Sequence, residues 1–378
     1  MSLSLYIHFP FCSNICSYCD FYKRKFSLEF QQSYFETLGR ELDLAASELE
    51  GHHKKIETIY IGGGTPSLAN PDHLEMFLNR CREYFDIEPG IEFTLEINPE
   101  SVDDILLARY KELGVTRPVL GFQSFFADQL AVLRRRHNVD HSYKAVYLLR
   151  ALGYTNFGVD MIFGLPGQTS ARLGDDLMQI IDLAPPHISY YQLTVEKGTP
   201  LAVQVENGKV ALPDSDLCAA MYRGINEELK RHNYIRYEVS SFAKPGYECR
   251  HNMRYWEGDD YLGLGPSAHS FINNRRFANV ADLDEYIKQI NQGVRPIVLD
   301  NRSREEQMYE AIMMGLRTAR GIVRENFRQR FDIDIEQAVN AEAFCIFSER
   351  GYIDRRDDAV CLTDSGLPLA DEIISRLV

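Results

Sequence analysis

Six short apolar segments, each followed by a stretch with helical periodicity, constrain the fold more than any other feature of this chain. Most are unbroken apolar runs, as expected for strands covered on both faces. The expected strands are residues 5–9, 58–61, 92–97, 119–121, 158–162 and 188–193. Strands that alternate with helices are joined by right-handed crossovers and form a parallel sheet. Six units are too few for a closed eight-stranded barrel, so we expect an α/β fold with an open, partial (β/α)6 barrel.

The stretches between these strands predict the outer helices, which are residues 26–49, 72–84, 102–113, 128–133, 141–152 and 171–183. Ligands of such sheets bind at the C-terminal ends of the strands. The unusual residues of this chain fall there, with three cysteines after the first strand, a triglycine turn after the second and Glu96 near the end of the third. We therefore expect the functional site at this edge of the sheet.

The pattern changes after about residue 275. Residues 304–317 and 325–331 are expected to be helical, and a small wing is expected before a last helix. We therefore divide the chain into a partial barrel, residues 1–275, and a smaller C-terminal helical, winged-helix-like domain, residues 276–378. Residues 322–378 carry twelve acidic and seven basic side chains. That sign is wrong for a nucleic-acid surface, so a lid or partner-docking role is expected.

Charge and cysteine usage exclude whole classes of protein. A net charge of −14 argues against nucleic acid or an anionic membrane as the main partner. The apolar runs are far shorter than a membrane span, and the N-terminus does not resemble a signal peptide, so a cytoplasmic location is expected. Eight cysteines, three of them close together, indicate metal binding rather than a disulfide framework. His52 and His53 are expected at the surface end of a helix.

The clustered cysteines follow the first strand as Cys12-Ser-Asn-Ile-Cys16-Ser-Tyr-Cys19. Thiolates are soft ligands that suit iron–sulfur clusters. Three of them can hold one cubane and leave one iron open, whereas electron-carrier clusters use four. The missing fourth thiolate therefore indicates a substrate on the open iron. A structural zinc site is the alternative, but zinc needs four closed ligands, and His8 would have to complete the set.

The cysteine run, preceded by Tyr6-Ile-His-Phe-Pro-Phe, resembles the radical S-adenosylmethionine (SAM) superfamily. The resemblance implies a 4Fe–4S cluster on Cys12, Cys16 and Cys19. SAM is then expected on the open iron, where reduction of its sulfonium releases a 5′-deoxyadenosyl radical. The protein's part is to position SAM and to keep the site dry.

The same resemblance assigns contacts with SAM. Segment 61–66, Ile-Gly-Gly-Gly-Thr-Pro, matches the turn that binds the methionyl amino group in this superfamily, and glycines let a backbone approach a ligand closely. An arginine suits the carboxylate of SAM, and acidic side chains suit its hydroxyls or ammonium. The implied SAM residues are Tyr6, Gly63, Gly64, Thr65, Glu96, Gln123, Arg135 and Asp160. One departure is Arg134, which stands where the family usually has glycine.

Within the superfamily, the whole chain resembles the proteins related to oxygen-independent coproporphyrinogen dehydrogenase, and among them the radical-SAM heme chaperones of the HemW type. Two features separate it from the dehydrogenase. Phe21 stands where the dehydrogenase has a further cysteine, and the first strand begins at about Leu5 instead of after an N-terminal arm. The resemblance implies a chaperone that binds cluster, SAM and heme and transfers heme to acceptor proteins, with peripheral contact to membrane-bound heme enzymes. A coproporphyrinogen dehydrogenase of porphyrin biosynthesis is the alternative, and whether the chain is an enzyme stays open.

The segment His251-Asn252-Met253-Arg254-Tyr255-Trp256 matches the H-N-x-x-Y-W signature that this family uses for heme. The resemblance therefore implies heme contacts from the His, Asn, Tyr and Trp of this segment. Imidazole is a common axial ligand of heme iron, and aromatic rings suit a flat macrocycle. The iron ligand stays open, with the Cys249 thiolate as an alternative. The plain alternative is that His251 and Asn252 bond the backbone while Tyr255 and Trp256 are core residues.

Overall fold

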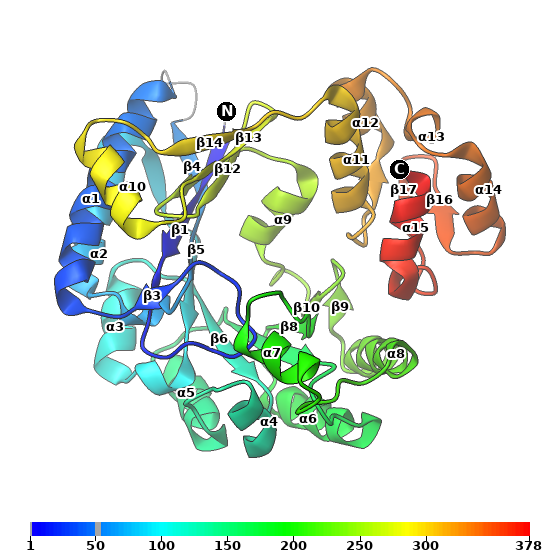
Figure 1. The fold of residues 1–378 in the computed structure, drawn as a ribbon, viewed down its shortest axis with the longest axis horizontal. Helices are drawn as coiled ribbons and strands as arrows, with labels where there is room; N and C mark the ends of the chain where they lie inside the picture. Colours follow the sequence, from blue (N-terminus) through cyan, green and yellow to red (C-terminus); the bar gives the residue numbers. More distant parts are fainter. Residues whose placement is uncertain (1, 50–53) are drawn as a thin grey trace.

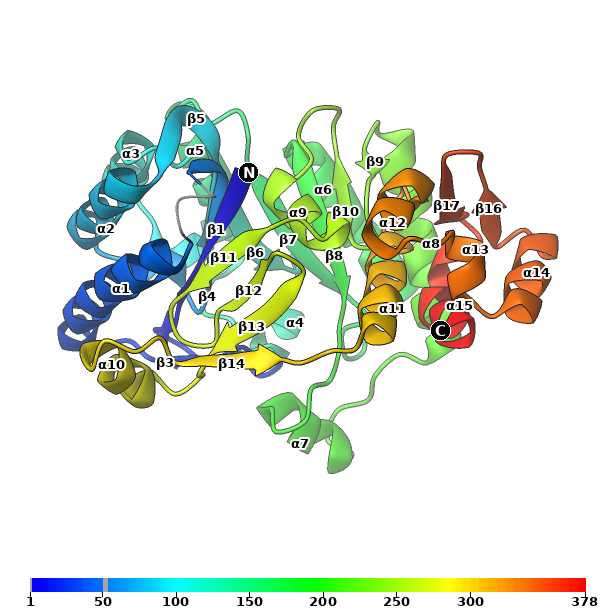
Figure 2. The same ribbon diagram turned by 90° about the horizontal axis from the view of Figure 1, so that it is seen from above.

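The computed structural model describes residues 2–49 and 54–378, and its largest element is a mixed sheet of twelve strands (Figures 1 and 2). His52 and His53 lie outside the described residues. Six parallel strands form the centre of the sheet and correspond one to one with the six predicted strands, which confirms the partial (β/α)6 barrel. In spatial order they are β1 (Ser2–Phe9), β4 (Lys55–Gly63), β5 (Asp86–Ile97), β6 (Arg117–Gln123), β7 (Gly158–Phe163) and β8 (His187–Gln192).

The sequence pattern did not predict the strands that extend the sheet at both edges. Beside β1 lie β11 (Tyr261–Leu264), β12 (His269–Ile272), β13 (Arg275–Asn279) and β14 (Ile297–Asp300). Beyond β8 lie β10 (Ser241–Ala243) and β9 (Ile235–Arg236). A separate short pair, β2 (Phe11–Cys12) and β3 (Arg24–Lys25), flanks the cysteine loop. Among the strands added to the large sheet, β11 pairs with β1 in parallel and the others pair antiparallel, while the separate β2–β3 pair is parallel.

Helices cover the convex side of the curved sheet, and the six predicted ones lie close to their expected bounds. The outer helices are α1 (Leu28–Glu48), α2 (Pro71–Tyr84), α3 (Asp104–Glu112), α4 (Ala127–Val132), α5 (Val139–Ala151), α6 (Ser170–Leu183), α8 (Ser215–Arg231) and α10 (Leu283–Asn291). Helix α9 (Arg250–Glu257) and the cysteine loop lie on the concave side, and α7 (Pro200–Glu206) follows β8 (Figure 1).

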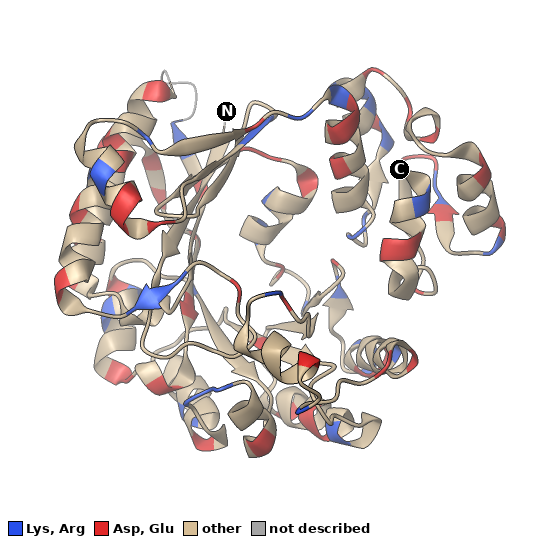
Figure 3. Cartoon of the chain, viewed as in Figure 1, with Lys and Arg blue, Asp and Glu red and all other residues tan. Residues whose placement is uncertain are grey.

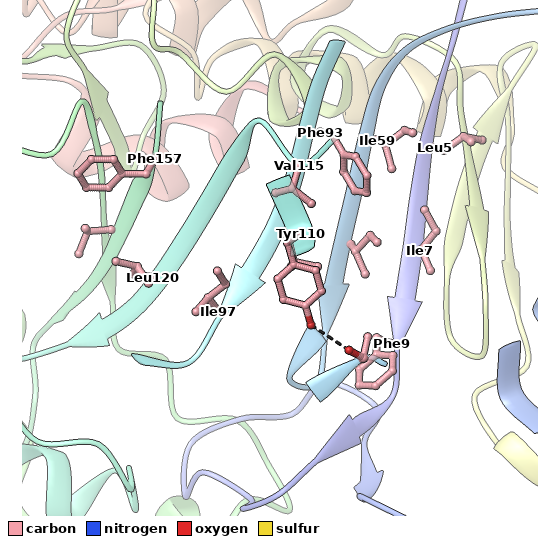
Figure 4. Close-up of a cluster of buried hydrophobic side chains, with 14 of the residues drawn as sticks. Leu5, Ile7, Phe9, Ile59, Phe93, Ile97, Tyr110, Val115, Leu120 and Phe157 are labelled. Atoms are coloured by element: carbon pink, nitrogen blue, oxygen red, sulfur yellow. Dashed lines mark hydrogen bonds between the residues drawn. The ribbon is translucent and has the colours of Figure 1, made fainter. Parts of the chain in front are cut away.

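Side chains along the central strands alternate between the two faces of the sheet. Leu5, Ile7 and Phe9 of β1 join the large hydrophobic cluster beneath the outer helices (Figure 4). Tyr110 of α3 belongs to the same cluster and donates a hydrogen bond of 2.9 Å to the carbonyl of Ala69. The intervening positions face the concave side and include Tyr6, His8, Thr58, Tyr60, Glu92, Glu96 and Asp160. The unbroken apolar runs concealed this polar alternation.

Residues after Ser303 form a smaller helical unit with its own hydrophobic cluster and a three-stranded sheet, in keeping with the winged-helix-like expectation. Its elements are α11 (Arg304–Gly315), β15 (Ile322–Val323), α12 (Arg324–Phe331), α13 (Ile335–Ala338), α14 (Ala341–Glu349), β16 (Ile353–Arg355), β17 (Ala359–Leu362) and α15 (Ala370–Leu377). We expected a boundary at residue 276. Because β13 and β14 still belong to the large sheet, we propose that the boundary lies between Asp300 and Arg304.

Charged residues of both signs are interspersed along the outer helices (Figure 3). These faces contact water, where exposed charges need no fixed partner. In the two described segments, 2–49 and 54–378, no helix has both the length and the apolar character that crossing a membrane requires.

Candidate functional site

A cavity of about 400 Å³ opens at the C-terminal ends of the central strands. The cysteine loop, the glycine turn after β4 and the ends of β5, β6 and β7 form its walls. The predicted residues that line it are Cys12, Cys16, Cys19, Gly63, Gly64, Thr65, Glu96, Gln123, Arg135 and Asp160. Tyr6 lies beneath this wall, where its hydroxyl contacts the Nδ1 atom of His8 at 3.1 Å. The structure thus brings the cluster and SAM candidates together, while what they bind stays a prediction.

The cysteine loop is fastened to the sheet by backbone hydrogen bonds. Gly64 donates to the carbonyl of Phe9 at 2.7 Å, and Thr65 donates to the carbonyl of Phe11 at 2.8 Å. On the far side of the loop, Ser17 donates from its amide to Leu133 at 3.0 Å. These contacts hold the three cysteines over the strand ends, because the loop is anchored on both of its sides.

The glycine turn has no room for side chains. Gly63 has a φ of 109°, and a Cβ atom there would lie 2.7 Å from the ring of His8. A Cβ atom on Gly64 would lie 2.6 Å from the carbonyl oxygen of Phe11. Burial lowers the pKa of His8 to about 4, so its neutral ring donates from Nε2 to the carbonyl of Tyr22 at 2.9 Å. The glycine turn therefore bonds the start of the cysteine loop, at Phe9 and Phe11, and His8 bonds its end, at Tyr22.

Two carboxylates line the cavity, Glu96 from β5 and Asp160 from β7. Glu96 accepts hydrogen bonds from the Tyr60 hydroxyl at 2.8 Å and from the Gly63 amide at 3.2 Å. Burial raises the pKa of Glu96 to about 7, and the nearby charge of Asp160 adds to that rise. Burial likewise raises the pKa of Asp160 to about 6. A cationic ligand would favour the ionised form of both groups.

Gln123, at the end of β6, and Arg135, after α4, line the same cavity. Arg135 donates from Nη2 to the carbonyl of Gly121 at 2.9 Å and to Asn98 at 2.8 Å, and its Nη1 lies 3.5 Å from the sulfur of Cys16. Its charge is therefore placed beside a candidate cluster ligand. Gln123 adopts a φ of 65°, and within the part of the chain that the structure describes its buried Oε1 has no hydrogen-bond partner. A buried orphan acceptor beside a cavity fits a ligand that carries donors.

Cys12, Cys16 and Cys19 are spread along the cysteine loop. Burial raises the pKa of the Cys12 thiol to about 11. Among residues 2–49 and 54–378, no group of three or more His, Cys, Asp or Glu side chains is close enough together to hold a single metal ion. A cubane is wider than one ion, so its ligands need not meet at one point. Three thiols that line one cavity fit such a cluster, which Cys12, Cys16 and Cys19 would hold.

Sequence reasoning missed several residues of this wall. Tyr60 and Asn98 line the cavity, and both contact predicted residues directly. The end of β8 and the loop after it contribute Tyr191, Gln192, Leu193, Thr194 and Glu196. A period of two along the strands would have found Tyr60 and Asn98, because Tyr60 precedes Gly62 by two residues and Asn98 follows Glu96 by two.

His251, the histidine of the expected heme segment, is not among the residues that line this cavity. His251 is 0 % exposed and is packed against the Tyr60 ring, with the ring centroids 5.1 Å apart. Its Nδ1 contacts the Thr58 hydroxyl at 2.7 Å and its Nε2 contacts the Tyr255 hydroxyl at 2.7 Å. Burial lowers the pKa of His251 to about 3, so the ring is neutral. Both ring nitrogens are hydrogen-bonded in this structure, so His251 would have to break one of these bonds to bind iron. His251 is enclosed in this way because α9 lies on the concave side of the barrel, against the strands.

The alternative thiolate is also enclosed. Cys249 is 0 % exposed, and burial raises its pKa to about 12, which disfavours the thiolate that a metal requires. Asn252 and Trp256 of α9 are half-buried, and Trp256 lines a second cavity against the C-terminal unit. Helix α9 therefore presents the heme segment on two faces. His251 and Tyr255 lie on the face toward the barrel, and Trp256 lies on the face toward the second cavity.

Replacing His251 with alanine is expected to lower the free energy of unfolding by about 3 kcal/mol, because two buried hydrogen bonds and the ring contact are lost. Heme affinity is expected to stay unchanged. Urea unfolding and heme titration of the same variant measure both effects. The control is His232→Ala, because His232 is exposed and, among the described residues, its side chain hydrogen-bonds only Glu228. A large loss of heme affinity with unaltered stability would restore His251 as a ligand.

Known protein families and relatives match this chain along nearly its full length. The family described as the Radical SAM superfamily matches residues 6–180, and the HemN C-terminal domain matches residues 303–369. The heme chaperone HemW of Lactococcus lactis is 33 % identical over 376 residues, covering 99 % of this chain and 97 % of the relative. That of Bacillus subtilis is 31 % identical and covers 99 % of both chains.

A solved structure supports the fold. The coproporphyrinogen III oxidase HemN from Escherichia coli, described as a radical SAM enzyme, superposes with a TM-score of 0.84 at 21 % identity. The match covers 99 % of this chain and 89 % of that one. At this identity the likeness concerns the architecture of barrel and C-terminal unit, and not the reaction.

Proposed function

Because the chain belongs to the HemW family within the radical SAM superfamily, we propose that it is a heme chaperone that binds a 4Fe–4S cluster, SAM and heme and transfers the heme to acceptor proteins. The observation that carries the proposal is the match to proteins named heme chaperones over nearly the full length of both chains. The proposal places the chain in the cytoplasm, where reducing conditions keep the three thiols available for iron. Acceptors include membrane-bound heme enzymes that the chaperone contacts peripherally.

In this proposal Cys12, Cys16 and Cys19 hold three irons of the cluster, and the cavity behind them receives SAM. A bound cluster with an open iron supplies the electron that reduces the sulfonium of SAM. The chain itself binds and orients SAM: the Gly63–Gly64 turn brings its backbone to the amino acid part, and the Glu96 carboxylate offers a negative charge to the cation. Gln123 offers its Oε1, which accepts no hydrogen bond from the described residues. Arg135, already fastened to Gly121 and Asn98, holds a positive charge beside Cys16 instead of reaching freely into the cavity.

Binding of SAM is expected to strengthen with rising pH between about 6 and 8. The pKa of Glu96 is about 7, so the carboxyl is neutral below that pH and ionised above it, and SAM is cationic at its ammonium and sulfonium. Equilibrium binding of SAM to the cluster-loaded protein across this range measures the effect. Glu96→Gln removes the titration near pH 7, so its affinity is expected to be weak and to change with pH only at the lower end of this range, where Asp160, with a pKa of about 6, still titrates. A variant that keeps the wild-type pH profile would show that another group titrates.

Phe21 supports the chaperone over the dehydrogenase. It occupies the position where the dehydrogenase has a further cysteine, and its ring is 64 % exposed beside the cluster loop. The two functions differ in what they consume. A chaperone takes up heme in a fixed ratio and releases it to an acceptor without forming a product. A coproporphyrinogen dehydrogenase consumes SAM in proportion to the vinyl groups that it forms.

One experiment tests the proposal. The protein is reconstituted anaerobically with iron and sulfide, titrated with heme and then mixed with an apo heme protein, while SAM cleavage is measured in the same tube. We expect stoichiometric heme uptake followed by transfer to the acceptor. Failure to take up heme, together with SAM-dependent oxidation of coproporphyrinogen, would overturn the proposal in favour of the dehydrogenase.

A further inference from the structure

A buried carboxylate, which the proposed function does not use, interrupts the apolar face of α6. Asp176 is 0 % exposed, and the other side chains that α6 buries are those of Leu173, Leu177, Ile180, Ile181 and Leu183. Within the part of the chain that the structure describes, Asp176 has no ion-pair partner, because the neighbouring Arg172 pairs with Asp128 at 2.5 Å. A buried carboxylate without a cation lowers stability unless hydrogen bonds satisfy it. Its hydrogen-bond partners therefore indicate its role.

Those partners lie in the turn that directly follows β6. The Oδ1 atom of Asp176 accepts a hydrogen bond from the amide of Phe125 at 2.8 Å, and its Oδ2 lies 3.2 Å from the Ser124 hydroxyl. The same hydroxyl lies 2.6 Å from Oε1 of Gln129, at the start of the next helix. Helix α6 is thus fastened to the two residues that come immediately after Gln123.

Gln123 has a backbone conformation that needs such support. Its φ is 65°, which residues with a side chain rarely adopt, and across it the amide of Ser124 donates to the carbonyl of Phe122 at 2.8 Å. A three-residue turn closed in this way with a positive φ at its centre is the rare, strained form of the γ-turn. The register between β6 and β7 shifts at the same place, between Gly121 and Gln123, and such a bulge re-aims a side chain. Strained residues persist where the surrounding structure over-determines them.

The re-aimed side chain of Gln123 lines the cavity of the proposed SAM site. A Cβ atom on Gly121 would lie 2.8 Å from its Nε2, so the amide group packs along the cavity wall beside this glycine. Its Oε1 is buried and accepts no hydrogen bond from the described residues. Asp176 is not among the residues that line the cavity, so it reaches the site only through the turn.

We propose that Asp176 is a positioning residue that holds the strained turn, so that Gln123 presents its Oε1 to a hydrogen-bond donor of SAM. This inference rests on the proposed function, because it assigns a further residue to the SAM site. A carboxylate suits the role, since an ionised acceptor makes stronger hydrogen bonds to amides and hydroxyls than a neutral one does. An apolar side chain at this position would leave the buried amide of Phe125 unpaired.

The test is a double-mutant cycle of Asp176→Asn and Gln123→Ala in the full-length, cluster-reconstituted protein, with SAM affinity as the readout. Asp176→Asn keeps the size of the side chain but replaces one acceptor oxygen with a donor. We expect each single variant to bind SAM about tenfold more weakly, which corresponds to one hydrogen bond. The double variant is expected to bind as weakly as Gln123→Ala alone, because both changes act through one contact. The matched control is Asp175→Asn, the same change at the exposed position one residue earlier, which is expected to keep wild-type affinity.

Thermal unfolding and cluster content separate positioning from a purely structural role. Asp176→Asn is expected to lower the Tm equally with and without Gln123, whereas the loss of SAM affinity should appear only where Gln123 is present. If wild type binds no SAM, the SAM part of the proposed function fails and this inference fails with it. If Gln123→Ala or Asp176→Asn binds SAM as wild type does, or if Asp176→Asn weakens binding equally in both backgrounds, the proposed function stands and the positioning role is overturned. Should Asp176→Asn not fold, Ser124→Ala removes the hydroxyl contact and takes its place in the cycle under the same criteria.

Discussion

Replacing Cys16 with serine is expected to leave the reconstituted chain without its iron–sulfur cluster. A cubane held by three thiolates has no spare protein ligand, and a serine oxygen is a poor substitute for a soft sulfur donor. The fold is expected to survive, because Cys16 is half-buried and takes no part in either large hydrophobic cluster. Iron and sulfide per chain, together with the cluster absorbance after anaerobic reconstitution, measure the loss.

The control for this variant is Cys345→Ser. Cys345 is exposed on α14 in the C-terminal unit, so its replacement is expected to leave iron and sulfide at wild-type levels. SAM cleavage requires the cluster, so the Cys16 variant is expected to lose it completely. Full iron and sulfide in Cys16→Ser would mean that the cluster has another ligand, and zinc in the oxygen-protected wild type would replace the cluster assignment altogether.

The features that were predictable from sequence are those with local causes. The six strands and their helices follow from apolar runs and helical periodicity within about thirty residues of chain, and the cysteine loop follows from spacing alone. The glycine turn was placed correctly because it directly follows a predicted strand. Its partners were not predictable, since the ring of His8 and the carboxylate of Glu96, which explain why Gly62 and Gly63 lack side chains, come from other strands.

The heme segment shows where local reasoning ends. Its six residues match a family signature, yet their roles depend on contacts with strands about 190 residues earlier, such as that of His251 with Thr58. The 3.6-residue period does place His251 and Tyr255 together on one side of a helix. It does not say which side faces the barrel. That choice is made by Glu92, which lies at an inward position of β5 that the apolar pattern concealed.

Replacing Glu92 with alanine is expected to lower the free energy of unfolding by about 3–5 kcal/mol. The carboxylate of Glu92 is buried and accepts hydrogen bonds from the first amides of α9, those of Arg250 at 2.9 Å and His251 at 2.7 Å. Its charge also acts on the buried guanidinium of Arg117. Alanine would leave two helix N-terminal donors unpaired and remove a counter-charge from the interior. Urea unfolding measures the loss.

The control is Glu88→Ala on the same strand, where the carboxylate is 65 % exposed and pairs with Lys55 at 3.0 Å. Its removal is expected to change stability by less than about 1 kcal/mol. Glu92→Gln keeps one acceptor oxygen and should fall between the two. Because α9 supports Tyr60, and Tyr60 holds Glu96, the alanine variant should also bind SAM less tightly in conditions where it is still folded. Equal stability losses for Glu88→Ala and Glu92→Ala would show that α9 is not held in the barrel by this carboxylate.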